Sequence, residues 1–153
     1  STITAKFLVE IIIFVIIFFI FLRVGAKVWQ FYVSKPQTVT QNSYTLLAQH
    51  IKYFDEQITD TFPLQVDERH IIKGFDKENT AKPELCDPLF SCLCICSLTC
   101  EKENIVKCKT LESSSSKEIR ITDEFIISYN EIITNYFLEL DEKKRISVHL
   151  EIQ

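Results

Sequence analysis

The apolar residues of this chain are concentrated at its start. Residues 11–22 are all apolar, and an apolar pattern extends over residues 7–33. A helix of that length would measure about 40 Å at 1.5 Å per residue, whereas a hydrocarbon core needs about 20 residues. Pro36 disfavours helix in the residue before it. The pattern therefore predicts a hydrophobic helix over residues 1–34 and a separate domain over residues 35–153.

The second part of the chain begins with a helical pattern. Residues 37–41 are expected to form a short connector, and Ser43 is a candidate N-cap for a helix of about 15 residues. Apolar residues then recur at spacings of four, three and four, which defines one helix face: Leu47, Ile51, Phe54 and Ile58. We expect this face to pack onto a sheet.

Strand patterns follow, separated by polar segments and prolines. Predicted strands lie within residues 69–77, 91–97, 105–111 and 118–126, and a terminal hairpin within residues 136–152. Loops are expected at residues 79–88 and 112–118, while residues 127–136 fit either a short helix or a loop. The apolar face of the last strand carries Ile146, Val148, Leu150 and Ile152. The fold class predicted is α+β, with an antiparallel sheet and one packed helix.

Three interpretations compete for the first helix. A signal peptide would require a small-residue cleavage motif after the apolar run, and none is evident. A transmembrane anchor fits the length, and Trp29, Phe31 and Tyr32 would form an aromatic belt at one interface. A pilin-type helix would first lie in the membrane and then pack in the core of a filament.

Charged residues near the run bear on this choice. Glu10 interrupts the apolar stretch four residues after Lys6, a spacing that allows an ion pair, although both side chains could equally be solvated near the headgroups. More cations follow the run than precede it, which by the positive-inside rule would place the following domain in the cytoplasm. A basic leader, removed during processing, would restore the opposite orientation.

Because the apolar run begins close to residue 1, residues 1–34 resemble the mature N-terminal helix of archaeal type IV pilin-like proteins, which is exposed by class III signal peptide cleavage. The resemblance implies a homo-oligomeric extracellular filament, with the helix in the membrane before assembly. In such an assembly Glu10 would pair with Lys6 or with the terminal amine of Ser1 on an adjacent copy. Two departures are that Glu10 lies farther from the start than the glutamate of bacterial pilins, and that Lys6 is unusual in that helix.

Six cysteines lie within 23 residues, and they are the most informative feature of the second part: Cys86, Cys92, Cys94, Cys96, Cys100 and Cys108. Zinc is disfavoured because no Cys-x-x-Cys pair occurs and the histidines are scattered. A reactive cysteine would need a neighbouring base that the pattern does not supply. An even number of cysteines favours disulfides, and hence an extracytoplasmic domain with a cysteine-rich hairpin at residues 86–108.

Strand geometry restricts the pairing. Cys92, Cys94 and Cys96 share one strand face and pair poorly with each other, so each needs a partner outside the strand. Six connectivities satisfy this condition. If Cys94 lies opposite Cys108 in the hairpin, proximity favours Cys86–Cys92 and Cys96–Cys100 for the others.

The remaining features indicate a structural protein and not an enzyme. The chain contains no phosphate-binding, dinucleotide, serine-hydrolase or zinc-protease motif, so we expect no catalytic residues and no cofactor or metal. The net charge is −4, and acidic and basic residues are interspersed, so the sequence does not indicate a nucleic-acid-binding surface. The acidic residues in the predicted turns are expected to be solvated: Asp67, Glu68, Asp76, Glu78, Asp123, Glu124, Asp141 and Glu142. We expect a filament subunit at the cell surface, with a membrane-anchored binding module or accessory subunit as the alternative.

Overall fold

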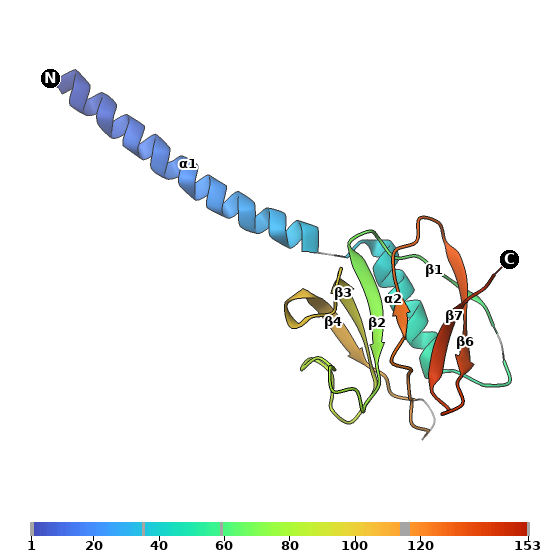
Figure 1. Ribbon diagram of the computed structural model, residues 1–153. Helices are drawn as coiled ribbons and strands as arrows, with labels where there is room; N and C mark the ends of the chain where they lie inside the picture. The colour runs from blue at the N-terminus through green and yellow to red at the C-terminus, as the bar shows by residue number, and fades with distance from the viewer. Residues whose placement is uncertain (1, 35, 59, 114–116, 153) are drawn as a thin grey trace. The chain divides into compact units, whose positions relative to one another are not determined.

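A computed structural model describes residues 2–34, 36–58, 60–113 and 117–152 (Figure 1). The chain divides into two compact units, Ser1–Lys35 and Pro36–Gln153. Unit 1 is the single helix α1 (Thr2–Ser34), which ends as Pro36 predicts. Within the described residues, only its Thr2–Gln30 portion is long and apolar enough to cross a membrane.

In the part of unit 2 that the structure describes, one α-helix combines with two antiparallel sheets, so the predicted α+β class is confirmed. The helix is α2 (Thr38–Lys52). One sheet has the strand order β4-β3-β2-β5 and the other the order β1-β6-β7. Their bounds are β1 (Phe62–Leu64), β2 (His70–Phe75), β3 (Cys92–Ser97), β4 (Ile105–Thr110), β5 (Ile126–Ile127), β6 (Thr134–Leu140) and β7 (Ile146–Leu150), with a 3₁₀ turn η1 (Lys102–Asn104) before β4.

The main core lies between α2 and the two sheets. Leu47 and Ile51 of α2 are fully buried against Leu93 and Ile95 of β3, together with residues of β1, β6 and β7. Gly74 of β2 is required by close packing here, because a Cβ at this position would lie 3.0 Å from side-chain atoms of both Ile121 and Phe125. The sheet therefore uses one face for this core and leaves the other face for the cysteines.

The predicted start of α2 was wrong by six residues, because its N-cap is Gln37 and not Ser43. The helix begins at Thr38, so the expected connector is its first turn, and Ser43 lies inside it. The Ser43 hydroxyl instead hydrogen-bonds the backbone of Gln65, and at the helix N-terminus the Gln37 N–H donates to Asp67, a residue distant in sequence. Phe54 and Ile58 lie beyond the helix end, and Ile58 is exposed.

Most predicted strands are present, with one exception. The predicted strand at residues 118–126 is present only at its end, where Ile126 begins the two-residue strand β5, which pairs with β2. Before it, Ile121 forms a single bridge with Ile146, and the Ile121 N–H donates to the Asp76 carboxylate. In the terminal hairpin, Ile146 is buried, whereas Leu150 and Ile152 are exposed. The predicted loop at residues 112–118 falls partly outside the described residues.

Candidate functional site

Strand β3 separates two cores by strict alternation. Leu93 and Ile95 face the main core, whereas Cys92, Cys94 and Cys96 face the opposite side of the sheet. All three cysteines are fully buried there, beneath Phe75 and the loop that carries Cys86. A six-residue strand thus supplies the main core and a second, sulfur-rich cluster.

All six cysteines form disulfides, as predicted. Cys94 and Cys108 occupy opposite positions in the β3–β4 ladder and are bonded to each other. The other two bonds join neighbours along the chain, Cys86–Cys92 and Cys96–Cys100. This connectivity matches the one derived from strand alternation and loop proximity, because residues on one strand face cannot readily bond each other.

Two of the disulfides are packed directly against each other. Cys94 Sγ lies 3.5 Å from Cys92 Sγ and 3.7 Å from Cys86 Sγ. With Cys108, these atoms form the sulfur cluster, in which all four Sγ atoms lie within 4.8 Å of one another. Among the described residues, these four side chains form a group whose ligand atoms lie close enough together to hold a metal ion. In this structure, however, all four sulfurs are bonded in disulfides.

The loop before β3 is held in place by Lys82. Its ammonium lies within 3.2 Å of four backbone carbonyl oxygens, those of Lys77, Asp87, Pro88 and Phe90. An ammonium has three protons, so these contacts keep it satisfied whichever three carbonyls accept at a given moment. The contacts close the loop around Cys86 independently of its disulfide.

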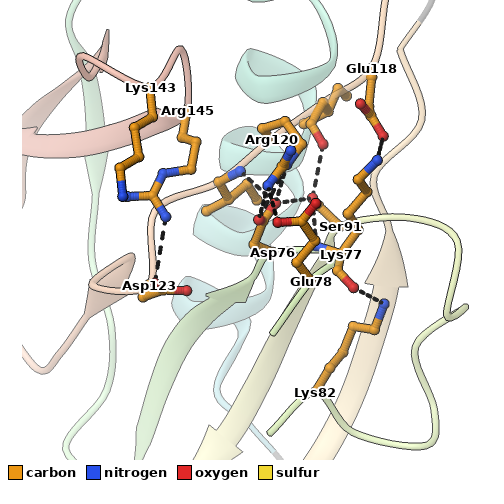
Figure 2. A network of polar contacts seen from close by, with 12 residues as sticks. Asp76, Lys77, Glu78, Lys82, Ser91, Glu118, Arg120, Asp123, Lys143 and Arg145 are labelled. Atoms are coloured by element: carbon orange, nitrogen blue, oxygen red, sulfur yellow. Dashed lines mark hydrogen bonds and ion pairs between the residues drawn. The ribbon is translucent and has the colours of Figure 1, made fainter. Parts of the chain in front are cut away.

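A buried ion pair involves Asp76, which directly follows the last residue of β2 (Figure 2). The carboxylate of Asp76, whose side chain is 4% exposed, accepts from Arg120 Nε at 2.9 Å and from the distal guanidinium nitrogen at 2.7 Å. Ser91 and the Ile121 N–H also contact it. Burial acts to raise the pKa of Asp76, but the Arg120 guanidinium and these hydrogen bonds outweigh it and hold the pKa at about 2.

A second buried carboxylate, Asp67, caps α2 from the loop before β2. Asp67 accepts from the Thr40 hydroxyl at 2.6 Å, from the Gln37 N–H at 3.2 Å and from His70 Nδ1 at 2.7 Å. Burial acts to raise the pKa of Asp67, but these donors keep it below its usual range. A negative charge at a helix N-terminus is also favoured by the helix dipole.

The expectation that the turn acids are solvated is therefore wrong for Asp67 and Asp76. Each belongs to a network that includes a partner from a distant segment, Thr40 for Asp67 and Arg120 for Asp76, which a local pattern does not reveal. Two features of the sequence were weak signs that these acids are not simply solvated. Asp67 lies three residues before His70, and Asp76 directly follows a strand.

Unit 2 also carries a hollow of about 350 Å³ at the end of α2. His50, Asp55 and Asp60 contribute its polar lining, and the His50 ring stacks on Phe62 at 4.1 Å between centroids. Phe54, Ile58 and Leu138 contribute its apolar lining.

In unit 1, the predicted assembly residues Lys6 and Glu10 are both exposed on α1, and Ser1 lies outside the described residues. Ile11, Ile12, Ile13 and Phe14 follow one another around the whole circumference of the helix, and each is at least 45% exposed. Every side of α1 thus presents apolar surface that a chain in water could not leave uncovered.

The apolar helix and the three disulfides are consistent with a membrane-anchored extracellular protein. No family model matches the chain, and neither does any of the curated proteins or solved structures with which it was compared.

Proposed function

We propose that the protein is a structural subunit of a pilin-like extracellular filament. In this account α1 anchors the chain in a membrane before assembly and then packs against the α1 helices of identical copies. Unit 2, held together by its disulfides, forms the outer surface. The observation that carries the proposal is that α1 presents large apolar side chains in every direction.

Glu10 gives this proposal its sharpest test. With Ile16 at the bilayer centre, Glu10 would lie about 9 Å from that centre, inside a hydrocarbon core whose half-thickness is about 15 Å. A carboxylate is costly there unless a cation or proton neutralises it. Lys6 is one turn away on the same helix, and the terminal amine of an adjacent copy is the second candidate.

The experiment compares two Glu→Gln variants in the native membrane system. Breaking a buried ion pair costs about 3–5 kcal/mol, whereas an exposed pair contributes below about 1 kcal/mol. Glu10→Gln should therefore abolish or strongly impair filament formation, seen by electron microscopy of sheared surface material, while membrane insertion and the fold of unit 2 remain. The matched control is Glu84→Gln, because Glu84 is 87% exposed and pairs with Lys102 on the surface of unit 2.

A single-span anchor that displays unit 2 as a binding module is the second candidate, and the hollow beside α2 favours it. For a lone anchor, Glu10→Gln should be neutral or slightly favourable to insertion. Normal filaments from the Glu10→Gln protein would remove this residue from the mechanism, and the absence of any filament from the unmodified protein would contradict the proposal itself.

A further inference from the structure

The sulfur cluster has the dimensions of a four-thiolate metal site. Zinc binds thiolates at about 2.3 Å, so the sulfur atoms of a tetrahedral site lie about 3.8 Å apart. The contacts between the two disulfides are 3.5 Å for Cys92–Cys94 and 3.7 Å for Cys86–Cys94. The bonded sulfurs, which lie about 2 Å apart in any disulfide, would have to separate.

The four cysteines come from three segments that are held by other interactions. Cys92 and Cys94 lie on β3, and Cys108 lies on β4, which is joined to β3 by a ladder of backbone pairs. Cys86 lies in the loop closed by Lys82. The main core lies on the opposite face of the sheet and contains no cysteine. Reduction of the disulfides therefore leaves a frame that keeps the four thiols together.

This arrangement needs no Cys-x-x-Cys turn. Residues i and i+2 of a strand share one face, so Cys92 and Cys94 supply two ligands from a strand, where zinc sites commonly use a turn. Lys73 lies opposite Cys94 in the β2–β3 register, and its ammonium lies 5.0 Å from the centroid of the Phe75 ring beside the cluster. Its positive charge would offset part of the net charge of −2 carried by one Zn²⁺ and four thiolates.

We propose that Cys86, Cys92, Cys94 and Cys108 bind one Zn²⁺ when they are reduced, and that oxidation to the two disulfides releases it. A dithiol reductant supplies two electrons and two protons to each disulfide and is itself oxidised to a disulfide. The four resulting thiols lose four protons as Zn²⁺ binds. In the reverse direction, two equivalents of a disulfide oxidant take up four electrons and four protons, the two protein disulfides form and the ion leaves. The site lies in unit 2 and does not depend on the filament proposal.

The test uses the full chain in detergent, reduced by a dithiol and freed of reductant under anaerobic conditions. Co²⁺ is the spectroscopic probe, because tetrahedral cobalt thiolates absorb strongly, and Zn²⁺ should displace it. Two double variants, each with four cysteines, are compared: Cys96→Ser/Cys100→Ser, which retains the sulfur cluster, and Cys94→Ser/Cys108→Ser, which does not. Far-ultraviolet circular dichroism of each bound form, compared with the oxidised protein, reports whether the chain is folded.

The cluster-retaining variant should bind one equivalent of Co²⁺ in a folded chain, and the other should bind more than about 100-fold more weakly. Addition of a disulfide oxidant should then release the ion stoichiometrically. Equal affinity of the two variants, failure of the cluster-retaining variant to bind, or binding only by an unfolded chain would each overturn the proposal.

Discussion

The buried pair between Asp76 and Arg120 should contribute strongly to the stability of unit 2. Asp76→Asn preserves the shape of the side chain but removes its charge. Arg120, 26% exposed, would then retain the ion pair with Glu78, whose side chain is 70% exposed. Loss of one partner from a buried pair costs about 3–5 kcal/mol, and we expect the lower end because water reaches Arg120.

The lowered pKa of Asp76 gives an independent value for the contribution of this pair to the stability of the folded chain. A fall from the ordinary value of 3.8 to about 2 corresponds to about 2 kcal/mol of stability at neutral pH. Because the pKa is lower in the folded chain, this contribution is complete above about pH 5 and is lost as the pH falls through 4 towards 2. The stability difference between Asp76→Asn and the unmodified protein should therefore shrink over the same range.

The assay is urea denaturation of the oxidised chain in detergent, followed by near-ultraviolet circular dichroism of the tyrosines and disulfides. The matched control is Asp123→Asn, because Asp123 also faces an arginine but is 66% exposed and lies 3.5 Å from Arg145 (Figure 2). We expect a loss below about 0.5 kcal/mol for the control. Equal losses for the two variants, or a difference that persists unchanged at pH 2, would refute the reasoning.

Three further predictions follow from the same structure. Denatured, unreduced protein should contain no free thiols, whereas six reactive thiols would contradict the disulfide assignment. Deletion of residues 1–34 should leave a soluble, folded monomer by gel filtration and circular dichroism, and aggregation under oxidising conditions would show that the two units are not independent. Gly74→Ala should cost about 1–3 kcal/mol by overpacking against Ile121 and Phe125, whereas Gly25→Ala, with no atom within 4 Å, should not destabilise; similar effects would contradict the packing described.

The features that could be predicted from the sequence depend on local periodicity. The three cysteines at alternate positions of one strand determine its face, and the reach of a disulfide then determines their partners. The end of α1 follows from Pro36, and the strands β2, β3 and β4 follow from short apolar runs. In each case the decisive information lies within a few residues.

What could not be predicted depends on pairing between distant segments. At the start of α2 the Gln37 N–H donates to Asp67, 30 residues away, whereas Ser43 had the better local signal for a cap. Asp76 takes its buried position from Arg120, 44 residues later. The sequence around such a carboxylate does not reveal a distant partner, because acidic residues in turns are usually exposed to solvent.

The central claim is that α1 contacts copies of itself, and site-specific photo-crosslinking tests it most directly. A photoreactive residue in place of Phe14, which is 71% exposed and one turn from Glu10, should yield a ladder of cross-linked dimers and larger species from assembled material. The same residue in a Glu10→Gln background should lose that ladder. Monomer with lipid adducts alone, in both backgrounds, would show that α1 is only an anchor and would contradict the account.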